Sequence, residues 1–154
     1  MTRAARAGFS KAAWATGLTV WLLATSVAAQ FPVMRLSAGI HVVQAEVAAT
    51  GETRMQGLMF RKSMGQNNGM LFVFAEEGRH CMWMKNTFVP LSVAFMDAKG
   101  TIVSIHDMEP HSEVSHCAAA QARFALEMNR GWFRSKGLAT GSRISGTEKA
   151  PPPQ

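Results

Sequence analysis

Short segments rich in apolar, β-branched and aromatic residues recur along the chain, separated by turns that contain glycine or proline. Residues 40–47 alternate roughly between apolar and polar side chains, which predicts a strand. Residues 70–75 are apolar at every position, a pattern typical of a central strand covered on both faces. Further strands are predicted at residues 81–85 and at residues 123–128, and the second of these alternates like a half-exposed strand.

A hairpin is predicted near the middle of the chain. Residues 92–96 and 101–106 are strand-like, and the turn of residues 97–100 between them ends in Gly100, which can adopt a positive φ. A loop of about 14 residues then follows at residues 109–122. Loops of this length in compact domains often carry function.

Only two short helices are predicted. Thr50 is a suitable N-cap for a helix that runs to Met59, and Asn129 for a helix that runs to Lys136. A last edge strand is predicted at residues 142–144. This balance of many short strands and little helix indicates a mainly β fold, α+β by content, arranged as an antiparallel β-sandwich or an open barrel with two short helices.

The first 29 residues have the three parts of a secretory signal peptide. Arg3, Arg6 and Lys11 give a positive start, an uncharged apolar stretch follows, and small residues precede a cleavage site near Ala29-Gln30. The pattern predicts a periplasmic or secreted protein, with an uncleaved membrane anchor as the alternative. The apolar stretch is short for a bilayer span of about 20 residues, which favours cleavage.

Setting the signal segment aside changes the charge of the chain. The 154 residues carry a net charge of +6, but three basic and no acidic residues lie in the signal segment, so the remainder carries +3. No basic patch of the kind that binds nucleic acid remains. Residues 30–145 are predicted to form one β-rich domain, and residues 146–154, which include three consecutive prolines, a disordered tail.

The two cysteines of the chain, Cys81 and Cys117, are 36 positions apart. In an oxidising compartment such a pair indicates a disulfide, which would tie the long loop to the strand predicted at residues 81–85. Closing a loop of this length stabilises a folded chain by roughly 3–4 kcal/mol. Metal-bound thiolates and two buried free thiols are the alternatives.

Three segments, in their order and spacing, resemble a known family. They are residues 55–61, then residues 69–74 followed by Trp-Met-Lys-Asn-Thr at 83–87 and by Pro90-Leu91, and finally residues 125–128 followed by Gly131, Trp132 and Gly137. Over roughly residues 34–145 the chain resembles the Domain of Unknown Function 192 family, and the run at 83–87 is the most specific part. The resemblance implies a compact β-rich domain, often exported in bacteria, without an established activity.

Lys85 and Asn86 are the first candidates for a binding site, because they lie where an apolar strand opens onto a turn that contains a proline. Lysine binds anions, and asparagine both donates and accepts hydrogen bonds. With Arg61, Glu127 and the long loop, they could line a pocket for an anionic or polyhydroxylated ligand. Alternatively, Lys85 pairs with an acid such as Glu127, and Asn86 satisfies the backbone of the turn.

A copper site is a second hypothesis. His80, Met82 and Met84 alternate along the chain, so on a strand they share one face, and thioether and imidazole groups suit Cu(I). Methionines at such positions also fill β cores, and spacing alone does not close a ligand set. Further donors of these types follow later in the chain, at His106, Met108, His111 and His116.

Catalysis is the third class of function considered. The chain contains no Gly-x-Ser-x-Gly, no His-Glu-x-x-His and no phosphate loop. His116 precedes Cys117 like a base beside a nucleophile, but a disulfide would remove that nucleophile. The sequence favours a binding or accessory role with a small-molecule or protein partner. We expect no nucleic-acid partner, no cofactor, and no stable membrane span after cleavage.

Overall fold

The computed structural model describes residues 31–154, so the predicted signal peptide lies outside the described residues. Strands dominate the described chain. In chain order the elements are β1 (Val33–Ala38), β2 (His41–Ala48), α1 (Gly51–Gln56), β3 (Asn68–Gly78), β4 (Cys81–Met82), β5 (Leu91–Met96), β6 (Ile102–Met108), β7 (His116–Cys117), β8 (Ala122–Asn129), α2 (Trp132–Ser135), β9 (Ile144–Ser145) and the 3-10 helix η1 (Thr147–Lys149). No helix in this part of the chain is long and apolar enough to cross a membrane.

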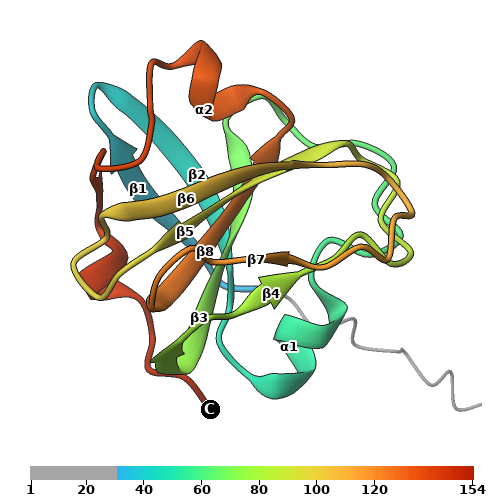
Figure 1. Ribbon diagram of the computed structural model, residues 1–154, viewed down its shortest axis with the longest axis horizontal. Coiled ribbons are helices and arrows are strands. Elements are labelled where there is room, and N and C mark those ends of the chain that lie inside the picture. Colours follow the sequence, from blue (N-terminus) through green and yellow to red (C-terminus); the bar gives the residue numbers. More distant parts are fainter. Residues whose placement is uncertain (1–30) are drawn as a thin grey trace, which may run out of the picture.

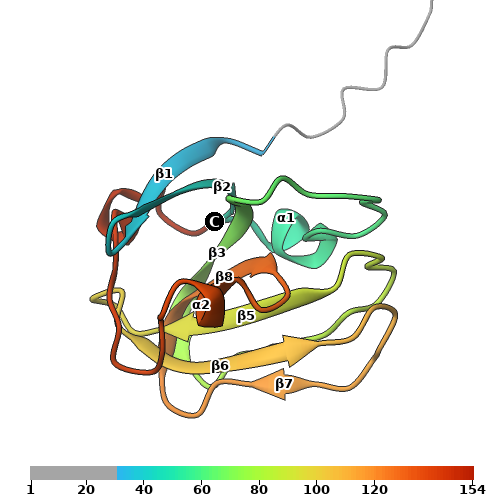
Figure 2. The same ribbon diagram turned by 90° about the horizontal axis from the view of Figure 1, so that it is seen from above.

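Seven strands form one curled sheet in the order β6-β5-β8-β3-β2-β1-β9. Neighbouring strands are antiparallel except β2 and β3, which are parallel. The sheet bends so far that β1 and β2 lie across from β5 and β6, and β3 and β8 connect the two sides (Figures 1 and 2). The mainly β prediction is confirmed in the form of a half-barrel with a separate two-stranded ribbon of β4 and β7.

The two edges of the curled sheet meet at one end. Thr101 forms an isolated bridge with Arg143, and the amide of Ile144 donates to the carbonyl of Gly100 at 2.9 Å. Gly100 has a φ of +78°, and a Cβ at this position would collide with the carbonyl oxygen of Ile144. The predicted hairpin turn therefore has a second role, because its glycine lets the opposite edge of the sheet approach.

Each face of the sheet is covered by its own core. On the inner side, side chains of the curled strands pack with Trp132 and Phe133 of α2. On the other side, Met70, Phe72 and Phe95 pack under residues of the connecting segments, including Leu58, Met84, Val89 and Ala118. Since β3, β5 and β8 are covered on both sides, an acid on either face of these strands is removed from water.

Two strands differ from their predictions. The alternation in β8 suggested a half-exposed strand, but Ala122 and residues 124–128 are buried, because the second core covers the face that alternation assigns to solvent. The strand predicted at residues 81–85 ends at Met82, and the chain then turns, with the amide of Thr87 donating to the carbonyl of Met84. Strand β1 was not predicted, and it pairs with β2 across a turn at Gly39.

The helices and the C-terminal residues also differ. α1 ends at Gln56 instead of Met59, because Gly57 takes a positive φ of 48°. α2 follows Gly131 and has no side-chain cap; Asn129 instead donates to the carbonyl of Gly65 at 2.9 Å. The residues predicted to form a disordered tail are placed on the fold, where Thr147 is buried and the amide of Gln154 donates to the carbonyl of Ala49.

Candidate functional site

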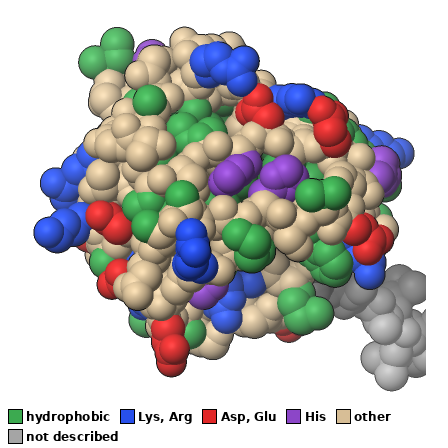
Figure 3. All heavy atoms as spheres, viewed as in Figure 1, with side chains coloured by type: hydrophobic (Ala, Val, Ile, Leu, Met, Phe, Trp, Pro, Cys, Tyr) green, Lys and Arg blue, Asp and Glu red, His purple; other side chains and the backbone are tan. Residues whose placement is uncertain are grey.

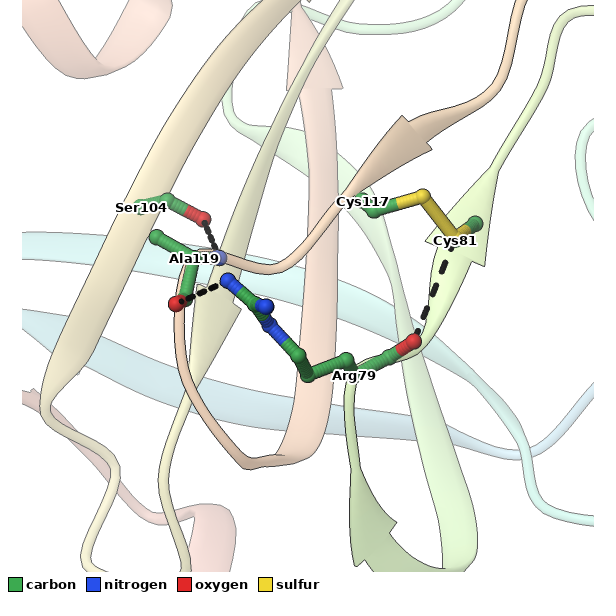
Figure 4. Close-up of a disulfide and its surroundings, with 5 residues drawn as sticks. All are labelled: Arg79, Cys81, Ser104, Cys117 and Ala119. Atoms are coloured by element: carbon green, nitrogen blue, oxygen red, sulfur yellow. Dashed lines mark hydrogen bonds between the residues drawn. A yellow bond between two sulfur atoms is a disulfide. The ribbon is translucent and has the colours of Figure 1, made fainter.

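A short ribbon of β4 and β7 covers one side of the sheet, and a disulfide holds its two strands together. Cys81 and Cys117 are directly paired across the ribbon and are joined by a disulfide, as the sequence predicts. A hydrogen bond from Arg79 to the carbonyl of Ala119 also joins the two sides of the ribbon, and the Ala119 amide donates to Ser104 of β6 (Figure 4). The disulfide therefore holds the ribbon together, and the Ala119–Ser104 hydrogen bond attaches its end to the sheet.

A groove of about 390 Å³ lies between α1 and β4. Its walls are mostly apolar side chains, namely Met55, Phe72, Phe74, Met82 and Trp83. A much narrower cavity of about 30 Å³ shares most of these walls and reaches Lys85, Thr87 and Glu127. The narrow cavity has space for about one water molecule, so a larger ligand can bind only with its main part in the groove and one polar group directed inward.

Glu127 lies at the inner end of this site. It belongs to β8, between Met70 of β3 and Val93 of β5, and its side chain is 3% exposed. Within residues 31–154 its carboxyl group forms neither a hydrogen bond nor an ion pair, and burial raises its pKa from 4.5 to about 8. At neutral pH the group is therefore mainly a neutral carboxylic acid, which can donate one hydrogen bond and accept others.

Two cationic side chains line the same site. Arg54 donates from Nη1 to the carbonyl oxygens of Ala49 and Val73, at 2.6 and 3.0 Å, which fixes its guanidinium beside the groove. Lys85 has its Nζ 5.2 Å from the ring centre of Trp83, within the range of a cation–π contact. Among residues 31–154, Glu127 is the only acidic residue in the walls of groove and cavity, so the site is positive when Glu127 is protonated.

The structure brings two of the four predicted binding residues together. Lys85 and Glu127 both line the narrow cavity, but among the described residues no ion pair joins them. Arg61 lies outside these walls and binds Glu46 through both guanidinium nitrogens, at 2.6 and 2.5 Å. The alternative in which Lys85 neutralises Glu127 therefore does not describe this arrangement.

Asn86 contributes its backbone instead of its side chain. It has a φ of 53°, a left-handed conformation that asparagine tolerates, and its carbonyl accepts a 2.8 Å hydrogen bond from the amide of Phe60. Phe60 and His111 also have positive φ values, and the amide of His111 donates to the carbonyl of Thr87. These bonds fix the turn that presents Lys85 and Thr87 to the cavity.

The three residues of the copper hypothesis do not converge. The ring of His80 stacks on Phe74 with 3.7 Å between ring centres, and its Nε2 lies 2.9 Å from the carbonyl of Glu76. Met84 is fully buried in the second core, whereas Met82 lines the groove. Across residues 31–154, no group of three or more His, Cys, Asp or Glu residues is arranged to hold a metal ion.

A second cavity of about 380 Å³ lies near α2 and has different polar groups. Its wall contains Ser92, Asp107 and Arg134. The hydroxyl of Ser92 donates to Asp107 and accepts a 2.8 Å hydrogen bond from the amide of Gly131, and Arg134 donates to Asp107 at 2.7 Å. Because these groups satisfy one another, they account for the local structure without a ligand.

Sequence reasoning missed most of the groove wall. Trp83 is marked in the sequence only as part of the run at residues 83–87, yet its side chain is 46% exposed and forms part of the groove. Arg54 and Met55 lie in the first predicted helix, and no motif marks them as binding residues. A usable signal in the sequence was that residues 51–56 contain one apolar side chain, Met55, since a helix without an apolar face leaves its side chains free to line a neighbouring space.

Fold and site together define a small β-rich protein with a curled sheet, a disulfide-tied ribbon and a groove that ends at a buried acid. The chain belongs to the DUF192 family, described as Uncharacterized ACR, whose model matches residues 33–146. No curated protein matches the chain.

Two solved structures are similar over most of the chain. A protein from Sinorhizobium meliloti 1021, provisionally described as a transcription regulator, has 35% identity and a TM-score of 0.73, and the match covers 77% of this chain and 97% of that one. A protein of unknown function from Novosphingobium aromaticivorans DSM 12444 has 28% identity and a TM-score of 0.70, over 73% of this chain and 84% of that one.

Proposed function

We propose that this is an exported binding protein whose groove takes a small ligand carrying hydroxyl groups and a negative charge. One observation carries the proposal: Glu127 is a buried carboxylic acid without a partner in the described chain, at the end of a groove. Buried polar groups are normally hydrogen-bonded, so an unpaired one that faces a cavity indicates a missing ligand group. A protonated Glu127 suits a hydroxyl group of the ligand. The hydroxyl can accept a hydrogen bond from the carboxyl O–H and donate one to the carboxyl C=O.

The charge of the groove selects the rest of the ligand. Arg54 and Lys85 are cationic, and Glu127 is mainly neutral at pH 7. An anionic group is therefore attracted to the site, whereas an amine is repelled. The exposed ring of Trp83 and its apolar neighbours offer a flat surface to the carbon skeleton of the ligand.

Export is the second part of the proposal. It is supported by the signal-peptide pattern of residues 1–29 and by the disulfide between Cys81 and Cys117, both of which are typical of proteins outside the cytoplasm. The provisional description of the Sinorhizobium relative is not carried over to this chain, because a shared fold does not fix function.

Titration calorimetry with three sugars of the same size tests the binding proposal. Glucuronate carries a carboxylate, glucose is neutral and glucosamine is cationic. We expect glucuronate to bind best and glucosamine worst, because the cations at the groove distinguish the charge of otherwise similar rings. No binding of glucuronate or glucose by folded protein, or equal binding of all three sugars, would contradict the proposal.

Lys85→Met provides the matched comparison, with Lys99→Met as its control. Both variants lose one exposed lysine, but Lys99 lies in the turn between β5 and β6, away from the groove walls. We expect Lys85→Met to weaken glucuronate binding by about 10-fold, and Lys99→Met to leave it unchanged. Thermal melting of both variants checks that each is folded.

A further inference from the structure

A second unpaired polar atom lies outside the groove. Within residues 31–154, Nε2 of His106 is the single side-chain nitrogen or oxygen atom that is closed off from solvent and has no hydrogen-bond partner, whereas the carboxyl group of Glu127 borders the narrow cavity. His106 lies on β6, opposite Val93. Its ring and the buried ring of Phe95 are arranged edge to face, with 6.0 Å between the ring centres. A buried imidazole nitrogen without a partner lowers the stability of the fold, because it has lost its hydrogen bonds to water. A bond to a metal ion would compensate for that loss.

His116 of β7 lies beside this ring. The two ring centres are 5.8 Å apart, with 48° between the ring planes. Two imidazole nitrogens bound at about 2.0 Å to one metal ion would place their ring centres roughly 5–6 Å apart. In Figure 3, histidine side chains lie next to one another on the face that carries β6 and β7 in Figure 1, so this region is reached from solvent.

Met82 brings a third donor to the same place. It is paired directly with His116 across the ribbon, and directly opposed residues of an antiparallel pair project from the same face. The neighbouring pair, Cys81 and Cys117, projects from the other face and is closed by the disulfide, so its sulfur atoms are not free to bind metal. The remaining donors are two imidazoles and one thioether.

We propose that His106, His116 and Met82 form a Cu(I) site between β6 and the ribbon. Imidazole nitrogen and thioether sulfur are soft, neutral donors, and a site with three such donors and no carboxylate suits Cu(I) better than Zn²⁺, Ca²⁺ or Mg²⁺. The disulfide holds β7 beside β4 and so fixes His116 opposite Met82. The two histidines lie outside the groove walls, whereas Met82 belongs to them, so His116→Gln is the variant that tests the copper site separately from the ligand proposed for the groove.

Anaerobic competition with a chromogenic Cu(I) chelator, bicinchoninate, tests the proposal. The exported chain with an intact disulfide is titrated with Cu(I) supplied as its acetonitrile complex. We expect one Cu(I) per chain to be withdrawn from the chelator. His116→Gln is expected to lower Cu(I) affinity by about 100-fold and Met82→Leu by about 10-fold, since each removes one donor.

His111→Gln and Met34→Leu are the matched controls, because His111 packs against the ring of Phe88 and Met34 lies on β1 at the edge of the inner core. Both are expected to bind Cu(I) like the parent. Imidazole NMR signals of His106 and His116 should shift together on addition of Cu(I), while those of His41 stay in place. A parent chain that withdraws no Cu(I), or a folded His116→Gln variant with parental affinity, would overturn the proposal.

Discussion

Asp107 and Glu127 are two acids on the same sheet with opposite surroundings. Asp107 accepts hydrogen bonds from Ser92 and Arg134, and these contacts hold its pKa below the usual 3.8. Glu127, two strands away on β8, has no such donor among the described residues, and burial raises its pKa to about 8. The first acid is a charged part of the structure, and the second is an uncharged group at the end of a cavity.

The comparison shows that burial and hydrogen-bond donors together decide the charge of an acidic residue, because Asp107 is partly exposed and has donors whereas Glu127 is buried and has none among the described residues. A carboxylate that receives donors from its own chain has no need of a ligand, whereas one that lacks them is free to bind something else. The two acids also affect stability in opposite directions as pH changes, which allows them to be distinguished by measurement.

The largest expected effect is the alkaline loss of stability caused by Glu127. Its pKa is raised from 4.5 to about 8 on folding, so its contribution is complete below pH 4.5, declines as pH rises, and is lost above about pH 8. At 1.36 kcal/mol per pH unit, the total change is on the order of 5 kcal/mol. Glu127→Gln stays neutral and should lack this decline, as measured by urea unfolding between about pH 5 and pH 9.

Asp107→Asn is the matched control for that experiment. The lowered pKa of Asp107 stabilises the fold above pH 3.8, and this contribution is lost as pH falls through the lower value of the folded state. The variant should therefore change the free energy of unfolding only on the acid side of its pH profile. An alkaline decline of equal size in the parent and in Glu127→Gln would show that Glu127 is not the titrating group.

The second effect in size is expected from removal of the disulfide. Replacing both Cys81 and Cys117 by Ser should lower the free energy of unfolding by roughly 3–4 kcal/mol, because the 36-residue loop is no longer closed. A looser ribbon should also admit water to the covered face, so the pKa of Glu127 should move toward 4.5 and the alkaline decline should shrink. Unchanged pH dependence in this variant would mean that the ribbon does not shield Glu127.

Ser92→Ala should have an intermediate effect. Ser92 is fully buried and serves both Asp107 and the amide of Gly131, so its loss leaves one donor and one acceptor unsatisfied. We expect a loss of about 1–3 kcal/mol in the free energy of unfolding and a rise in the pKa of Asp107. A double-mutant cycle with Asp107→Asn measures the coupling, and additive effects would show that Ser92 does not stabilise the carboxylate.

The smallest effect is expected for Arg134→Ala. Its side chain is 80% exposed, and ion pairs at such positions contribute little. The free energy of unfolding should fall by less than about 0.5 kcal/mol, with a small upward change in the pKa of Asp107. A loss much larger than this in chemical denaturation would mean that Arg134, and not Ser92, is the main partner of Asp107.

The sequence predicted the presence of strands, helices and turns more reliably than the residues at which they begin and end. The turn at Gly100 and the central strand at residues 70–75 followed from residue type and spacing, and the disulfide followed from the cysteine count and the predicted export. α1 ended early because Gly57 takes a positive φ, and α2 began later because Asn129 bonds to Gly65 instead of capping it. These differences arise from contacts with distant residues, which a local pattern does not contain.

The sequence by itself determined the family, the strand-rich character and the identity of the two cysteines that pair. Only the tertiary structure decided that Glu127 is buried, that Lys85 does not neutralise it, and that His106 lies beside His116. The physical reason is that alternation along a strand assigns a side chain to one face of the sheet. Whether that face meets water depends on what the rest of the chain packs over it.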